Sequence, residues 1–302
     1  MDLYDNLKQF VDNSINSYIE KEHNIKLKEI ISYSLNGGKR VRPIICLLVF
    51  RNFIGKKNIN QNETNLTNFI LIPEILHNIS LILDDLPCMD NDQFRRNKET
   101  THYKYGIIPS YISIIKMTNN LFMEFINIID LNKKFCFKNS LDKIETKNFR
   151  KFVKEIICQY MNTLIDGQYY DLSFLNIDLD LEVLYKINSK KTAPLFSLSF
   201  LLGYLQIVHF DTEFIIEYKI IEKLNELGEL FGFIFQLNDD IVDRDTDLEE
   251  GKNLNLAINL GYEKSIELFN LKCLEFQTKL ESINLWNENF EEIIILLKKR
   301  LK

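Results

Sequence analysis

Helical periodicity along almost the whole chain is the feature that most limits its fold. Apolar residues recur at spacings of three and four, as over residues 7–15 and 220–231, which places them on one face of an α-helix. The 302 residues include only ten glycines and five prolines, and no proline follows Pro194. Because alternating strand patterns are rare and no segment has a linker composition, the sequence predicts an all-α fold in one domain over residues 1–302.

Charge and composition limit the partners and the cellular compartments that we expect for the protein. A net charge of −6 and a pI near 5.4 leave no basic field, so we expect no nucleic-acid partner. Five cysteines, an odd number without CxxC spacing, favour a reducing compartment. The acidic start resembles neither a signal peptide nor a transit peptide. Only Ala193 and Ala257 are alanines among many Asn, Ile and Lys residues, which indicates an AT-rich genome. We therefore favour an organelle-encoded plastid protein, with the cytoplasm as the alternative.

The most apolar stretch, residues 193–210, could be mistaken for a membrane span. It contains Ser197, Ser199, Gln206 and His209 and lacks a matching flank pattern. These polar residues favour a buried central helix of a protein that is not integral to a membrane.

Two aspartate clusters carry the main chemical signal. The first is DDLPCMD over residues 84–90, and the second is DDIVD over residues 239–243. Each follows an apolar segment, and carboxylates at such positions are costly unless a cation neutralises them. On a helix, Asp239 and Asp243 share a face with Asp240 beside them. Pro87 would end or bulge a helix and let both ends of the first cluster converge. The pair of clusters indicates a Mg²⁺ site, because Mg²⁺ commonly bridges carboxylates to phosphates.

Basic segments recur along the same chain. Residues 37–43 (GGKRVRP) combine backbone freedom with three cations, and Arg95 and Arg96 follow the first acidic cluster. Glycine-rich backbone and arginine side chains both suit phosphate groups. An isolated basic pair is usually solvated surface charge. In a net acidic protein, however, basic and acidic groups together describe a diphosphate site bridged by metal.

The whole chain, in order, resembles the trans-isoprenyl diphosphate synthases, and most of all the geranylgeranyl diphosphate synthases of bacterial and plastid type. The matching residues are 37–43, 74–77 (EILH), 84–92 with Arg95 and Arg96, 167–171 (GQYYD), Lys191 with Thr192, Phe235 with Gln236, 239–243, and Gly251 with Lys252. The resemblance implies a helical bundle around a deep central cavity, a homodimer, and about two or three Mg²⁺ ions.

The resemblance also implies roles for single residues. Mg²⁺ would be held from one wall by Asp84, Asp85 and Asp90, and from the other by Asp239, Asp240 and Asp243. Isopentenyl diphosphate would be bound by Lys39, Arg42, His77 and Arg96. The allylic diphosphate (dimethylallyl, geranyl or farnesyl) would be bound by Arg95, Lys191, Thr192, Gln236 and Lys252. In this family, residues four and five positions before the first aspartate limit product length, and here they are Ser80 and Ile79. Neither is a bulky aromatic, which favours the C20 product.

The match departs from the family pattern after Gly251 and Lys252. The chain continues almost directly to Leu260 and Gly261, so a segment with one or two phosphate-facing lysines is missing by comparison. This departure leaves open a catalytically weakened subunit that modulates a partner synthase, and a farnesyl diphosphate synthase also stays an alternative. A class I terpene cyclase is disfavoured, because the second cluster is DDIVD and the GGKRVRP segment is present.

Overall fold

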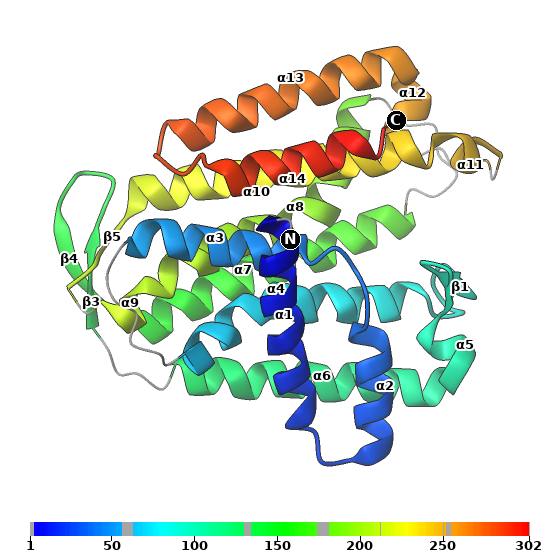
Figure 1. Cartoon of the computed structure of the whole chain (residues 1–302), viewed down its shortest axis with the longest axis horizontal. Coiled ribbons are helices and arrows are strands. Elements are labelled where there is room, and N and C mark those ends of the chain that lie inside the picture. Colours follow the sequence, from blue (N-terminus) through cyan, green and yellow to red (C-terminus); the bar gives the residue numbers. More distant parts are fainter. Residues whose placement is uncertain are drawn as a thin grey trace. The chain divides into compact units, whose positions relative to one another are not determined.

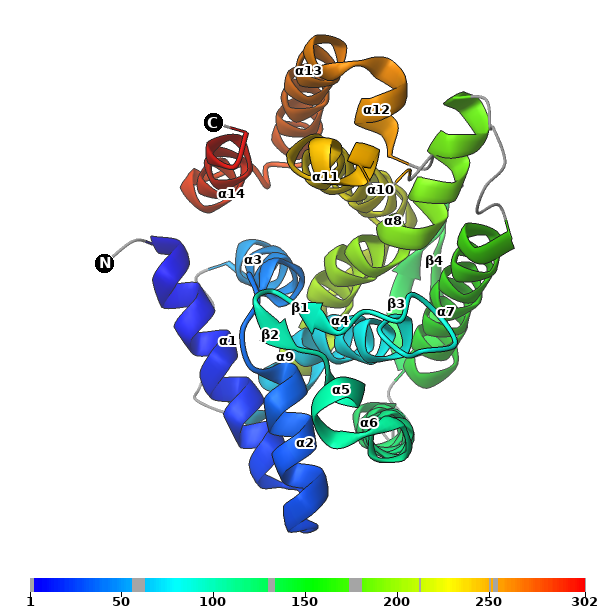
Figure 2. The same cartoon turned by 90° about the vertical axis from the view of Figure 1, so that its right-hand side faces the viewer.

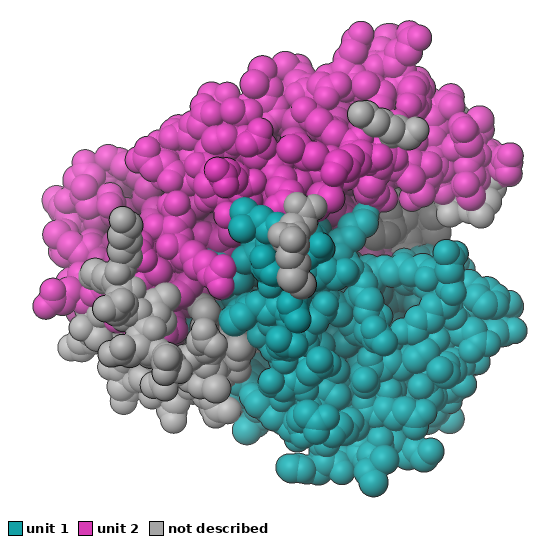
Figure 3. Space-filling view, in the orientation of Figure 1, with its two compact units in different colours: residues 1–47, 57–132 teal, residues 48–56, 133–302 magenta. Residues whose placement is uncertain are grey.

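The computed structural model describes residues 3–55, 63–129, 134–173, 181–211, 213–249, 251 and 255–301. Helices dominate the described residues, so the predicted all-α class is confirmed (Figure 1). Contacts divide the chain into two compact units, coloured separately in Figure 3. Unit 1 comprises residues 1–47 and 57–132, and unit 2 comprises residues 48–56 and 133–302. The single-domain assignment of residues 1–302 stays a prediction.

Unit 1 is a small helical assembly that carries the first aspartate cluster. In the view of Figure 2, α1 and α2 lie side by side. The amide oxygen of Asn24 caps α2 by accepting the N–H groups of Lys26 and Leu27. The elements of this unit are α1 (Leu3–Glu20), α2 (Ile25–Leu35), the start of α3 (Val41–Ile54), α4 (Glu63–Asp84), β1 (Phe94–Arg95), β2 (Lys98–Glu99), α5 (Thr101–Tyr105) and α6 (Ile107–Ile129).

Unit 2 carries the second aspartate cluster at the end of its long helix α10 (Tyr218–Val242). Its other helices are α7 (Phe149–Ser173), α8 (Leu181–Leu205), α9 (Ile207–Phe210), α11 (Arg244–Glu249), α12 (Leu256–Leu260), α13 (Tyr262–Glu281) and α14 (Glu288–Lys299). Its strands are β3 (Lys134–Lys138), β4 (Ile144–Asn148) and β5 (Ile215–Glu217).

Small residues let α8 and α10 pack closely. A Cβ atom added to Gly228 would lie 2.2 Å from the Cα of Ser197, and one added to Gly232 would lie 2.6 Å from the Cα of Ala193. Both pairs are spaced by four residues, so they form one stripe on each helix. The close packing against α8 fixes the position of α10 and therefore of the carboxylates at its C-terminal end.

The apolar stretch that could be mistaken for a membrane span is a core element of unit 2. One helix in the described chain, over Thr192–Phe210, is long and apolar enough to cross a membrane, and 89% of its window is buried inside the protein. Fully buried Phe196 and Phe200 pack edge-on against Phe231 and Phe276 of the neighbouring helices. The expectation of a buried helix is therefore confirmed, with a break at Gln206 between α8 and α9.

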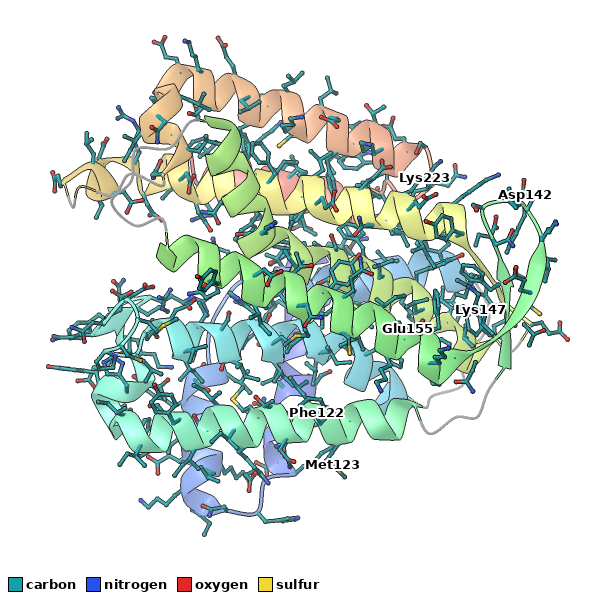
Figure 4. All side chains as sticks on the ribbon, turned by 180° about the vertical axis from the view of Figure 1, so that it is seen from behind. Phe122, Met123, Asp142, Lys147, Glu155 and Lys223 are labelled. Atoms are coloured by element: carbon teal, nitrogen blue, oxygen red, sulfur yellow. The ribbon has the colours of Figure 1, made fainter. Side chains whose placement is uncertain are left out.

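A short sheet is the feature of unit 2 that the prediction of an all-α fold did not include. Strand β3 pairs antiparallel with β4 and parallel with β5. Phe135 and Phe137 point into the core, whereas Cys136 between them is exposed. The Lys147 ammonium group lies 3.7 Å over the Phe137 ring, and Figure 4 labels Lys147 on this hairpin. The alternation of buried and exposed residues extends over only one strand. A pattern this short cannot be distinguished from the helical periodicity of the surrounding sequence.

Candidate functional site

The first aspartate cluster begins where α4 ends. The backbone N–H of Asp90 donates to the carbonyl oxygen of Asp84 at 2.9 Å, so the chain folds back on itself within six residues. The carbonyl of Leu86, whose side chain is fully buried, accepts the N–H groups of Met89 and Asn91 and holds this loop. The backbone at the two ends of the cluster therefore converges, and convergence of the carboxylates on one ion stays a prediction. Asp84 is buried at the helix end and Asp90 is exposed.

The carboxylate of Asp85 forms an ion pair with the guanidinium of Arg95. The Arg95 guanidinium donates to Asp85 at 2.5 Å and to Asp92 at 3.3 Å. Burial raises the pKa of Asp85, while Arg95 acts in the opposite direction. The pair places a carboxylate and a guanidinium predicted for the same substrate in direct contact.

The glycine-rich loop combines two glycines of positive φ with a buried arginine. Gly37 and Gly38 have φ values of 92° and 102°, which favour glycine. The guanidinium of Arg40 donates to Glu74 at 2.7 Å, to Asp12 at 2.8 Å and to the carbonyl of Leu35 at 2.6 Å. Its charge is therefore used to hold the loop. This corrects the expectation that all three cations of residues 37–43 are available to bind phosphate groups.

A cavity of about 400 Å³ in unit 1 is lined by both basic and acidic residues that the sequence predicted for the site. Its lining includes Gly37, Gly38, Asp85, Arg95 and Arg96. The Arg96 guanidinium lies 2.8 Å from where a Cβ of Gly38 would be, so a side chain at this position would displace the guanidinium. The hairpin between β1 and β2 turns at Arg96 and Asn97, whose φ values of 56° and 58° suit a type I′ turn. The turn directs a cation to the glycine-rich loop.

His77 lies among guanidinium groups in the same unit. Burial, together with the positive charges of Arg42 and Arg96, holds the pKa of His77 well below its usual range. The ring is therefore neutral at pH 7 and is suited to hydrogen bonding. Arg42 is buried and Lys39 is exposed, so the four residues predicted for isopentenyl diphosphate differ in accessibility.

The second cluster occupies the end of α10, with Asp243 as its C-cap residue. A chain of hydrogen bonds orders Asp240: Thr192 donates to Gln236 at 2.8 Å, and Gln236 donates to Asp240 Oδ1 at 2.8 Å. The backbone N–H of Leu256 donates to Asp240 Oδ2 at 2.9 Å. Both oxygens of this buried carboxylate thus have protein donors. Burial raises the pKa of Asp240 to about 6.

Comparison with known proteins gives the family. Residues 24–261 match the family model described as polyprenyl synthetase. The chain belongs to the polyprenyl synthetase family. The predicted resemblance to trans-isoprenyl diphosphate synthases is confirmed, and the chain is a prenyltransferase by family.

Two relatives and one solved structure are similar to this chain over most of its length. The chain is 28% identical over 289 residues to farnesyl diphosphate synthase of Micrococcus luteus, covering 92% of this chain and 90% of that one. It is 31% identical over 283 residues to the chloroplastic heterodimeric geranylgeranyl pyrophosphate synthase large subunit 1 of Arabidopsis thaliana, covering 90% and 69%. A structure of geranyltransferase from Helicobacter pylori, complexed with magnesium and isoprenyl diphosphate, matches with a TM-score of 0.68 and 26% identity, covering 97% and 96%.

The donor set of this polyprenyl synthetase suits Mg²⁺ that arrives with a diphosphate. Within the described residues, no group of three or more His, Cys, Asp or Glu side chains forms a preassembled metal site. Mg²⁺ commonly takes one or two carboxylates and completes its shell with substrate phosphates and water. Asp84 with Asp90, and Asp239 with Asp243, are pairs of that kind. These residues therefore fit Mg²⁺ and would hold it through carboxylate oxygens.

Two residues predicted for the allylic diphosphate lie outside what the structure describes. They are the side chain of Lys191 and the whole of Lys252. Thr192 and Gln236 are hydrogen-bonded to each other, and Arg95 is paired with Asp85.

The structure also identifies residues that sequence reasoning missed. Asn255 caps α12 and donates to the carbonyl of Asp240 at 2.8 Å and to Asp247 at 2.9 Å. Arg300, at the end of α14, donates to the carboxylate of Asp239. Its position in the basic run of residues 298–300 was the available signal, but nothing local indicated the partner.

Proposed function

We propose that the chain is a Mg²⁺-dependent synthase that condenses isopentenyl diphosphate with allylic diphosphates to make geranylgeranyl diphosphate for carotenoid and other isoprenoid biosynthesis. The observation that carries the proposal is the unit 1 cavity, where Gly38, Arg96 and Asp85 line one space. A glycine backbone with positive φ, guanidinium groups and carboxylates together suit a diphosphate and its cations.

The residues suit the chemistry of the reaction. Mg²⁺, when bound, would stabilise the departing diphosphate and so favour cleavage of the allylic C–O bond. Arg95 would bind that diphosphate, while Arg96 and neutral His77 would hold isopentenyl diphosphate for attack. Proximity of the two substrates supplies much of the rate. The released diphosphate can accept the proton that is lost when the new double bond forms. No side-chain base is therefore required of His77, whose lowered pKa suits a hydrogen-bonding ligand.

The C20 product is proposed from the residues before the first aspartate. Ser80 donates its hydroxyl to the carbonyl of His77 at 2.9 Å, so its small side chain stays against its own helix. Ile79 is the other position, and neither residue supplies an aromatic ring to stop a growing chain. The farnesyl diphosphate synthase of Micrococcus luteus among the relatives makes the shorter C15 product the second candidate.

A homodimer is proposed from the outer face of α6. Ile108, Ile115, Phe122 and Met123 are 72%, 67%, 62% and 50% exposed, and Figure 4 labels the last two on this helix. The two charged residues of α6 are paired within the chain, Lys116 with Glu22 and Glu124 with Lys21. An uncharged apolar face of this kind fits a second copy of itself.

A plastid location is also proposed, on the AT-biased composition and the chloroplastic relative in Arabidopsis thaliana. Locating the encoding gene and fractionating organelles with an antibody to the chain tests it. Recovery in the cytoplasmic fraction alone would replace the plastid proposal.

The decisive experiment is turnover of the purified protein with Mg²⁺, radiolabelled isopentenyl diphosphate and dimethylallyl, geranyl or farnesyl diphosphate. We expect a C20 product, lost in Asp84→Ala and in Asp239→Ala. A C15 product that is not extended would assign the farnesyl synthase activity. Absence of product from folded protein with every starter would favour the weakened subunit, which is the alternative that the shortened segment after Lys252 left open.

A further inference from the structure

The C-terminal end of α14 is fastened to the second aspartate cluster. Arg300 Nη1 donates to Asp239 Oδ1 and, at 2.6 Å, to Asn238 Oδ1. The amide nitrogen of Asn238 donates to the carbonyl of Leu297 at 2.9 Å, which fixes the orientation of its amide group. Because Asn238 is fully buried, Arg300 is held beside Asp239 by a rigid partner.

The contact between Arg300 and Asp239 lies at the solvent edge of unit 2. Their side chains are 27% and 31% exposed, whereas those of Arg40 and Glu74, the buried pair of unit 1, are 4% and 8% exposed. An ion pair at such an edge contributes little net stability and separates readily. Arg300 can therefore leave Asp239 without disrupting the fold, and Arg40 cannot leave Glu74 in the same way.

Asp239 is also one of the carboxylates of this cluster that a divalent cation would use, together with Asp243. Its neighbour Asp240 has both oxygens engaged by Gln236 and Leu256. The guanidinium of Arg300 occupies an oxygen of Asp239 that a cation would take. A guanidinium and a divalent cation on one carboxylate repel each other.

We propose that Arg300 is a resident counter-ion of Asp239 that competes with the divalent cation, so that metal binding at the second cluster requires release of Arg300. This inference rests on the proposed function, because it uses Asp239 as a metal ligand. Asn238 keeps the released guanidinium near the cluster. Arg300 is thus a positioning residue: it holds Asp239 in place and sets how tightly this carboxylate binds metal in the absence of substrate.

The test measures Mn²⁺ binding to the full chain without substrate, by electron paramagnetic resonance of free Mn²⁺ and by calorimetry. We expect Arg300→Gln to bind Mn²⁺ roughly three- to tenfold more tightly than the wild type, because no guanidinium has to be displaced. Lys299→Gln is the matched control: it removes the same charge from the adjacent exposed residue, and it should change the affinity much less. Equal affinities for Arg300→Gln and Lys299→Gln would overturn the proposal.

Two further variants keep the test decisive. Arg300→Lys retains the charge at the end of α14 with a single ammonium group, and we expect an intermediate Mn²⁺ affinity even if the glutamine variant is unstable. A folded Lys variant that binds Mn²⁺ as tightly as the glutamine variant, or more tightly, would count against competition, because the retained ammonium group should still oppose the cation. Asp239→Asn distinguishes a failure of the Arg300 inference from a failure of the proposed metal role of Asp239. Loss of one Mn²⁺ site in Asp239→Asn with no effect of Arg300→Gln removes this inference alone, whereas an unchanged number of Mn²⁺ sites and unchanged affinity in Asp239→Asn removes the metal role of Asp239 as well.

Discussion

Asp90 donates its backbone N–H to the carbonyl oxygen of Asp84 at 2.9 Å. This bond joins two residues that a straight helix would place on different faces. The loop between them contains Pro87, which has no N–H to continue the helix, and it is anchored by the buried side chain of Leu86. The two carboxylates are thereby attached to one rigid backbone ring.

Asp84→Asn and Asp90→Asn are predicted to lower kcat/KM by about a hundredfold or more each, because each removes a carboxylate from the same cation. The double variant should be little worse than either single variant, since the second loss removes a ligand from an ion that is already released. Steady-state kinetics with saturating Mg²⁺ measures all three. Glu20→Gln, an exposed carboxylate of the same unit, is the control. Fully additive losses would show that the two residues act separately.

Gly38→Ala is predicted to raise the KM for isopentenyl diphosphate about tenfold or more, because its Cβ would displace the Arg96 guanidinium, 2.8 Å away. Gly37→Ala is the matched control: its φ is also positive, but nothing lies within 4 Å of the added atom. Both variants should lose about 1 kcal/mol of stability from backbone strain. Substrate titration and thermal unfolding measure the two effects. Equal KM values for the two variants would remove the steric explanation.

Arg40→Met is predicted to destabilise the fold by about 3–5 kcal/mol, because it leaves Glu74 buried without its partner. The double variant Arg40→Met with Glu74→Met should recover much of this loss, since no charge then stays buried. Lys28→Met, which breaks an exposed pair with Glu20, should cost less than about 1 kcal/mol. Urea denaturation monitored by circular dichroism gives all the values. A small loss in Arg40→Met would mean that solvent reaches Glu74.

The stability of the protein is predicted to depend on His77 below pH 7. The folded-state pKa of His77 lies below its unfolded value, so its contribution to stability is present above about pH 6.5 and is lost as the pH falls. The decline has an upper limit of about 1.4 kcal/mol per pH unit, because one proton is bound on unfolding. Denaturant titrations between pH 7 and pH 5 should show a shallower decline in His77→Gln. His23→Gln, at an exposed residue, should keep the wild-type slope, and equal slopes for the two variants would contradict the assignment.

Ile115→Asp with Phe122→Asp is predicted to convert a dimer into a monomer, because it places two charges on the apolar face of α6. Sedimentation velocity at several protein concentrations measures the change. Leu271→Asp with Leu274→Asp is the control, since these residues of α13 are 61% and 60% exposed. A wild-type protein that sediments as a monomer would remove the homodimer proposal. A dimer disrupted by the α13 pair instead would move the interface to that helix.

Much of the fold and part of the site could be predicted from local pattern. The helical period identified the buried stretch of α8, and the residue types of the two clusters identified the carboxylates. The sheet of β3, β4 and β5 was missed, because β5 lies some eighty residues away along the chain and its pairing leaves no local pattern. Arg40 shows the same limit: its sequence neighbours suggested an anion ligand, whereas Glu74 and Asp12 make it a structural residue.

The sequence by itself determined that this protein is helical and that it carries two aspartate clusters with basic groups, because period and residue type are properties of short segments. Only the tertiary structure decided which charges are committed to partners. Arg300 and Asp239 are 61 residues apart, and Glu74 and Arg40 are 34 apart. The energy of a charge depends on which groups surround it after folding, and that environment is assembled from distant parts of the chain.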